Sequence, residues 1–287
     1  MGQLKQPMNS NRLYTKRTLS ETVNMVFDFV GEHWRLCLRM MVYFLLPFSV
    51  LLGATIATFY NEADESMSAY VISAILFIVG CTVVTTLGIL LVKWHEDHNG
   101  SLDGLDASTM LRLMPGPSLR CLGIIVLGNV FLALALVTMI IPIIGFVAVF
   151  AALPVFLVCP IMLLESRNLP SGLVGRAFSL GYKKWGTLIL LALIMGVVAA
   201  LINNAATFPL GIITIVESLL EQPTADSVLW TFILDLIRYV LCVAECFIIF
   251  VGIGLFVLAM TYHYGSVATE VDDIGLENDI NNFADLK

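Results

Sequence analysis

Charged residues are scarce in this sequence. They make up 13% of the 287 residues, whereas residues of the classes AVILMFWYC make up 59%. Soluble globular domains carry roughly 25% charged residues, so we expect neither a soluble globular domain nor a disordered chain. The sequence also lacks a concentrated basic surface, and we therefore expect no nucleic-acid partner. Its six cysteines are scattered without a C-x-x-C pair, which indicates buried, reduced thiols rather than a disulfide scaffold.

The motifs of common enzymes are missing as well. The sequence contains no H-E-x-x-H, G-x-S-x-G, P-loop or G-x-G-x-x-G motif. The segment from His95 to His98, followed by Asp103 and Asp106, has the residue types of a metal site but matches no known ligand spacing. We therefore predict a protein that is not an enzyme and that uses no metal or cofactor.

Long apolar stretches are what the sequence has instead. A hydrocarbon core of about 30 Å needs about 20 apolar residues to be crossed by one helix. Six stretches qualify, at residues 40–60, 68–92, 121–141, 143–164, 186–202 and 240–262. They predict an all-α fold, a bundle of six transmembrane helices in which Pro142 marks a tight hairpin between the third and fourth. The apolar run at 207–220 is shorter, and we expect an interfacial or re-entrant helix there.

Lysine and arginine are distributed unevenly between the predicted spans. All but one of the 15 basic residues lie in the N-terminal segment, in the loops after the second and fourth spans, or at the end of the chain. The other loops carry only acidic residues. Since basic loops stay in the cytoplasm, we predict cytoplasmic termini and, for a bacterial protein, an inner-membrane location. The predicted division is a cytoplasmic segment at 1–17, a membrane domain at 18–264 and an acidic cytoplasmic tail at 265–287.

A repeated pattern precedes the odd-numbered spans. Phe27-x6-Trp34 and Phe178-x6-Trp185 each lie in an amphipathic stretch directly before a span, and a weaker copy at 109–114 precedes the third span. Thr18 and Glu21 have the spacing of a capping box at the start of the first copy. The pattern predicts interfacial helices and a threefold repeat of one interfacial helix plus two spans. Chance similarity between amphipathic stretches is the alternative interpretation.

Three segments in the middle of the chain carry a resemblance to a known family. They are Leu153-Pro-Val-Phe-Leu-Val-Cys-Pro160 through Leu164-Glu165, Gly175-Arg176-Ala-Phe-Ser-Leu180, and Lys184-Trp185-Gly186. This pattern resembles the membrane domain of membrane-bound glycerophosphodiester phosphodiesterases and of related six-span bacterial membrane proteins. Glu165, Arg176 and Trp185 match it, whereas Ala177 replaces the usual serine.

The resemblance implies a fold and no activity. The phosphodiesterase site of that family belongs to a separate soluble barrel, and six spans leave no room for a domain of about 250 residues. We expect Glu165, Arg176 and Trp185 to form a structural clamp, a set of contacts that holds two neighbouring helices together. In this interpretation a salt bridge ties the fourth span to the interfacial helix that follows it.

Polar residues inside the spans are the remaining candidates for a site, because such residues are costly in a bilayer. Asp235, Arg238 and Glu245 have spacings that place them along one side of a helix. They indicate either a substrate or proton site facing the bundle interior or an ion pair at the outer interface, and we favour the ion pair. Asn129 in the third span is a further candidate, with hydrogen bonding between helices as its alternative role.

These observations favour a membrane scaffold or regulatory protein. Its partners would be the lipid bilayer and a protein at the cytoplasmic face. The alternative is a transporter or lipid-handling protein with a site between helices. A polar cavity at the middle of the membrane with Asn129 or Glu245 in its wall would favour transport.

Overall fold

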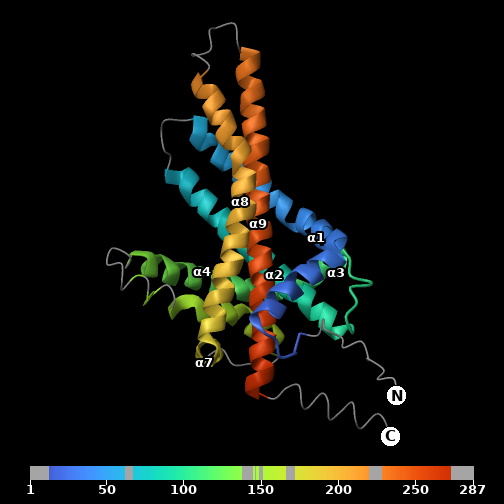
Figure 1. Cartoon of the computed structure of the whole chain (residues 1–287). Helices are drawn as coiled ribbons and strands as arrows, with labels where there is room; N and C mark the ends of the chain where they lie inside the picture. Colours follow the sequence, from blue (N-terminus) through green and yellow to red (C-terminus); the bar gives the residue numbers. More distant parts are fainter. Residues whose placement is uncertain are drawn as a thin grey trace.

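The computed structural model describes residues 13–61, 67–137, 145, 147–148, 151–165, 172–219 and 228–272. This part of the chain is helical and contains no strand (Figure 1). The elements are α1 (Leu19–Asn61), α2 (Met67–Asp97), α3 (Ala107–Leu113), α4 (Pro115–Val137), the 3₁₀ helix η2 (Leu153–Leu157), α6 (Val158–Leu164), α7 (Leu173–Lys183), α8 (Trp185–Leu219) and α9 (Val228–Asp272).

Four described helices, α1, α2, α8 and α9, are long and apolar enough to cross a membrane. A fifth crossing is counted if α3 and α4, which meet at 60°, form one broken span. The all-α prediction is therefore confirmed, and the chain has the helices of a multi-pass membrane protein. The count of six spans is not confirmed. The Pro142 hairpin and most of the acidic loop residues lie outside the described residues.

The fourth predicted span is represented by a shorter apolar helix, Leu153–Leu164. It begins as the 3₁₀ helix η2, with Pro154 near its start, and continues as α6. Proline has no backbone N–H to donate and favours the first turn of a helix. Because residues 151–152 before it are also helical, Pro154 marks a change to 3₁₀ geometry at a position where hydropathy alone predicts the middle of a span.

Two helices are longer than the apolar stretches predict. α1 joins the first amphipathic segment to the first span, with non-helical backbone angles at His33 (φ −114°, ψ 21°). α8 joins the fifth span to the 207–220 stretch in one helix that passes through Pro209. In its described part that stretch continues the helix of the fifth span and does not turn back as a re-entrant segment. The Asn204 amide and the Thr207 hydroxyl bond to carbonyls one turn earlier, so these polar residues are satisfied within the helix.

Each predicted repeat unit contains a break before its long helix. The breaks lie at His33 in α1, at Met114 between α3 and α4, and at Lys184 between α7 and α8. The capping box at the first unit is confirmed, because the Thr18 N–H donates to the Glu21 carboxylate at 2.7 Å and the Glu21 N–H lies 3.4 Å from the Thr18 hydroxyl. The three breaks lie at equivalent positions of the three predicted repeat units. The threefold repeat stays a prediction.

α9 is the central helix of the bundle. It packs along both α1 and α8 (Figure 1), while α4 runs across the direction of these helices. At Gly53 of α1 a Cβ atom would lie 2.8 Å from the backbone nitrogen of Val243 in α9. Glycine is therefore what allows this close approach of two helices, as is common in membrane bundles. With 45 residues, α9 is about 67 Å long, roughly twice the thickness of a hydrocarbon core.

The C-terminal end of α9 lies in a packed region that we call the base. Residues 257–268 are all buried there, and the segment 13–18 lies against them. Arg17 bonds to Ser266, and Lys16 pairs with Glu270. The first and last described residues therefore lie at the same end of the molecule, as an even number of crossings between them requires. Residues 265–272, which begin the predicted tail, belong to α9.

Candidate functional site

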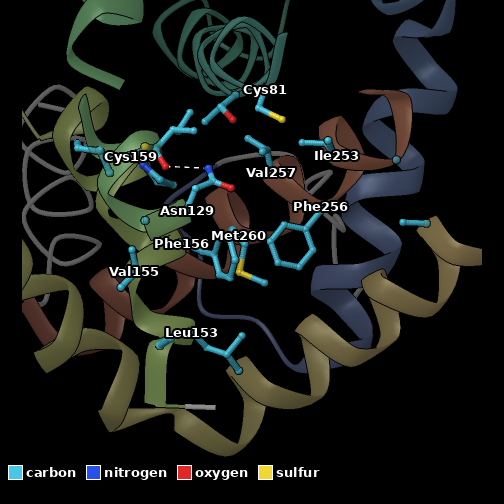
Figure 2. A pocket seen from close by; sticks show the side chains of 18 of the residues that line it. Cys81, Asn129, Leu153, Val155, Phe156, Cys159, Ile253, Phe256, Val257 and Met260 are labelled. Carbon is cyan, nitrogen blue, oxygen red and sulfur yellow. Dashed lines mark hydrogen bonds between the residues drawn. The ribbon is translucent and has the colours of Figure 1, made fainter. Parts of the chain in front are cut away.

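A cavity of about 650 Å³ lies between α2, α4, η2, α6, α8 and α9 (Figure 2). Its volume falls in the range of pockets that hold one small molecule. Apolar side chains form most of its wall, and the rings of Phe156 and Phe256 meet there edge to face with centroids 5.1 Å apart. The cavity is therefore suited to an apolar molecule or to the apolar part of a larger one.

The cavity reaches the flank of the bundle. Phe131 of α4 is 48% exposed and Phe156 of η2 is 43% exposed, and Asn129 and Ala200 are also exposed. All four residues contribute to the wall. Since this flank is formed by the apolar helices α4 and α8, a bilayer around the protein would place lipid chains at the opening.

Few polar side chains line the cavity. Asn129 of α4 donates through its amide nitrogen to the Ile125 carbonyl of the same helix at 2.8 Å, and Figure 2 shows it beside Cys159. Asn203 of α8 is the second amide in the wall, and its Oδ1 atom is enclosed without a hydrogen-bond partner. The structure thus places the predicted candidate Asn129 in the wall. Asn203 lies in the same wall.

The three ionisable residues of α9 do not line this cavity. The Arg238 guanidinium lies 3.4 Å from the Asp235 carboxylate, one turn away on the same helix. Glu245 lies seven residues beyond Arg238 on α9 and is half-buried. Asp235 and Arg238 therefore form the pair that their spacing predicts, and Glu245 is separate from it.

Glu165 and Arg176 form a salt bridge at the base. The Arg176 Nε atom donates to the Glu165 carboxylate at 2.6 Å, and its second guanidinium nitrogen donates to Asp272 at the same distance. Glu165 also accepts a hydrogen bond from the Tyr264 hydroxyl at 2.8 Å. Burial disfavours the cation, but the hydrogen bonds from Arg176 to Asp272 and Glu165 raise the pKa of Arg176 above its ordinary value. Trp185 begins α8 and is 45% exposed.

Tyr264 and Asp272 are the partners in this cluster that sequence reasoning missed. Both lie on α9, about a hundred residues from Glu165 or Arg176 along the chain. No local spacing links positions so far apart. The only signal is that Tyr264 and Asp272 follow the last span at positions facing the cytoplasm in the predicted topology.

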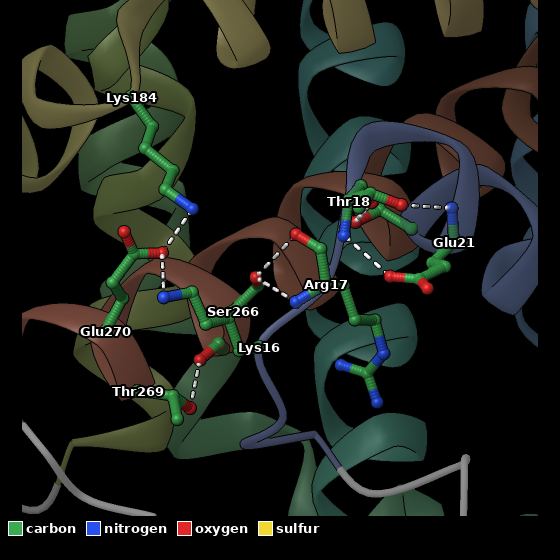
Figure 3. A network of polar contacts seen from close by, with 10 residues as sticks. Lys16, Arg17, Thr18, Glu21, Lys184, Ser266, Thr269 and Glu270 are labelled. Atoms are coloured by element: carbon green, nitrogen blue, oxygen red, sulfur yellow. Dashed lines mark hydrogen bonds and ion pairs between the residues drawn. The ribbon is translucent and has the colours of Figure 1, made fainter.

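The N-terminal segment 13–18 is fixed to the base by a second network (Figure 3). The Arg17 N–H donates to the Ser266 hydroxyl at 2.9 Å, and that hydroxyl lies 3.3 Å from the Arg17 carbonyl. Glu270 pairs with both Lys16 and Lys184. The Leu13 N–H donates to the Glu96 carboxylate of α2 at 2.6 Å. This segment therefore joins α2 to the end of α9.

The residues that resemble metal ligands do not come together. His95 is buried against Phe29 and His33, whereas His98 stacks on Trp94. Asp106 caps α3 by accepting from the Thr109 N–H at 2.9 Å, and the hydrogen bonds from Thr109 lower the pKa of its carboxyl group. Among the residues that the structure describes, no group of three histidine, cysteine or acidic side chains could hold a metal ion.

Comparison with known proteins finds no match to this chain among family models, curated proteins or solved structures.

Proposed function

We propose that this protein binds a lipid-like molecule in the cavity between α2, α4, α6, α8 and α9. The observation that carries the proposal is the size and apolar character of this cavity together with its opening on the flank of the bundle. A molecule dissolved in the bilayer reaches such an opening without crossing water. Because polar groups are few in the wall, a lipid-handling role is favoured over the transport of polar solutes.

A scaffold or regulatory role remains a prediction from the sequence. The network that holds segment 13–18 on the base supplies a well-defined face on which another protein could bind. The cavity gives the lipid-binding role a more specific basis, because a structural role alone does not require a cavity of this size.

A photoreactive dodecanol carrying a diazirine near the end of its chain tests the binding role. We expect it to label peptides from α4, η2, α8 or α9 in the protein reconstituted into lipid nanodiscs. Ala200→Phe places a ring in the wall at an exposed position of α8 and should reduce labelling at least fivefold.

Ala205→Phe is the matched control, because Ala205 is exposed on the same helix and does not line the cavity. It should leave labelling unchanged. Equal labelling of both variants, or labelling spread evenly along all lipid-facing helices, would rule out the cavity as the binding site.

We further propose that the base faces the cytoplasm of a bacterial cell and that the membrane is the inner membrane. The support is the placement of basic residues, since Lys16, Arg17, Arg176 and Lys184 all belong to the base network and basic segments stay in the cytoplasm. The six-span count and the threefold repeat remain predictions within this topology.

Epitope tags inserted after Asn61 and after Gly100 test this orientation. In intact spheroplasts we expect antibody to reach the tag after Asn61 and to reach the tag after Gly100 only when the membrane is permeabilised. The reverse pattern would show that the base faces outward.

A further inference from the structure

Among the described residues of the cavity wall, Thr85 of α2 carries the only hydroxyl group. Cys81, one turn earlier on α2, also lines the cavity (Figure 2), and residues four apart share one face of a helix. Thr85 is 9% exposed. This face of α2 therefore places a buried hydroxyl group against the cavity.

Thr85 differs from the threonines on either side of it. The Thr82 and Thr86 hydroxyls donate to carbonyls one turn earlier in α2, each at 2.8 Å, as threonine commonly does inside a helix. The Thr85 hydroxyl makes no hydrogen bond within the described part of the chain. Its oxygen is also not enclosed, in contrast to the Asn203 Oδ1 atom. Because Thr85 is otherwise buried, the accessible surface of its hydroxyl lies in the cavity.

The cavity wall is uncharged. Aspartate, glutamate, lysine, arginine and histidine are all missing from the described residues that form it. An ion placed against this wall would lose its hydration without gaining a counter-ion, which is costly in an apolar site. A neutral polar group needs only a hydrogen bond to replace its contact with water. The wall therefore favours an uncharged head group.

The position of Thr85 sets the direction in which a bound chain lies. The exposed rings of Phe131 and Phe156 belong to the wall at the flank, where the cavity opens. Thr85, by contrast, is buried on α2. A head group bonded to Thr85 is therefore held on the closed side of the cavity, and its chain points through the opening toward the bilayer.

We propose that the cavity binds an uncharged single-chain lipid with a hydroxyl head group, of the chemical class of the long-chain alcohols. The hydroxyl of the lipid bonds to Thr85, and its chain leaves past Phe131 and Phe156. A threonine hydroxyl both donates and accepts a hydrogen bond. An alcohol matches both roles, whereas an ether or a ketone can only accept. This inference rests on the proposed lipid-binding function and adds the chemistry of the head group.

Competition against the diazirine dodecanol in nanodiscs tests this head group. The competitors are dodecanol, dodecane, dodecylamine and dodecanoate, which share a chain length and are compared by their mole fraction in the bilayer. One neutral hydrogen bond changes an affinity by about three- to tenfold. We therefore expect dodecanol to displace the label at a mole fraction about fivefold lower than dodecane. The charged dodecylamine and dodecanoate should both be weaker competitors than dodecanol.

Substitutions on α2 test the role of Thr85. Thr85→Val removes the hydroxyl and keeps the branched shape, and it should reduce the advantage of dodecanol over dodecane to twofold or less. Labelling by the corresponding diazirine dodecane should stay unchanged, which would show that the cavity is intact. Thr85→Ser keeps a hydroxyl and should keep the preference. Thr82→Val is the matched control, because Thr82 bonds within α2 and does not line the cavity.

The outcomes separate the head group from the binding of the chain. Equal displacement by dodecanol and dodecane, or stronger displacement by either charged competitor, would overturn the proposed head group while leaving chain binding intact. A preference for dodecanol that survives in Thr85→Val would overturn the role of Thr85. Failure of both labels to enter the cavity would instead contradict the proposed function.

Discussion

Gly265→Ala should release the N-terminal segment 13–18 from α9. A Cβ atom at this position would lie 2.4 Å from the Leu13 carbonyl oxygen and 2.8 Å from the Leu13 Cδ1 atom. The carbonyl belongs to the backbone, and the Leu13 N–H is held by Glu96, so the segment has to move as a whole. Alanine in a helix gains about 1 kcal/mol over glycine, whereas overpacking costs about 1–3 kcal/mol. The steric effect outweighs the gain, since the released contacts with Ser266 and Glu270 are lost too.

Limited trypsin digestion measures this release. Lys16 and Arg17 are held against α9 by Glu270 and Ser266, and in the Gly265→Ala protein we expect cleavage at these residues several times faster than in the wild type. The melting temperature in detergent should fall by several degrees. Gly196→Ala is the control, because a Cβ at Gly196 of α8 meets nothing within 4 Å. Unchanged protection of Lys16 and Arg17 in Gly265→Ala would contradict the tight contact with Leu13.

Arg176→Ala should be the most destabilising loss of a charge in the base. It removes the bonds to Glu165 and Asp272 and leaves the Glu165 carboxylate, whose side chain is 16% exposed, with the Tyr264 hydroxyl. Hydrogen bonds to charged groups contribute about 1.5–3 kcal/mol each. The Arg176 side chain is 30% exposed, and solvent screening lowers the sum. We expect a loss of about 2 kcal/mol in the free energy of unfolding.

Thermal unfolding in detergent compares Arg176→Ala with Arg112→Ala, which removes an exposed arginine from the last turn of α3. The second variant should melt within about one degree of the wild type. Arg176→Lys should recover only part of the stability, because lysine lacks the planar fork that bonds two carboxylates at once. Equal melting temperatures for the two alanine variants would show that the salt bridges of Arg176 contribute nothing measurable.

Much of the helical architecture follows from hydropathy. The apolar stretches at 68–92 and 186–202 lie within α2 and α8, and the last span lies within α9. Hydropathy measures where apolar surface is, and it does not report where the backbone breaks. The described part of the fourth span therefore changes to 3₁₀ geometry at a proline that the apolar count ignores. α8 continues through residues 203–207, where the Asn204 and Thr207 side chains bond to carbonyls of their own helix.

The candidate site is less visible in the sequence. A polar residue in a predicted span stands out because burying it in a bilayer costs free energy. This criterion identified Asn129 and Glu245 as candidates. The significance of Thr85 depends on which atoms surround its hydroxyl group, and the cavity wall comes from helices far apart along the chain. The pairing of Glu165 with Arg176 is local enough to be expected, whereas the bonds from Arg17 to Ser266 and from Tyr264 to Glu165 join distant positions.

The length of α9 gives the two ends of the molecule a mechanical connection. One uninterrupted helix carries Glu245 past the end of the cavity, Phe256 in its wall, and then Tyr264 and Ser266 in the base. A hydrogen-bonded helix is stiff along its axis, so a rotation or shift that accommodates a chain beside Phe256 is carried over two turns to Tyr264. The contacts that hold Arg17 at the base and a molecule bound in the cavity therefore act on the same helix. A shift of α9 caused at one end strengthens or weakens the contacts at the other end.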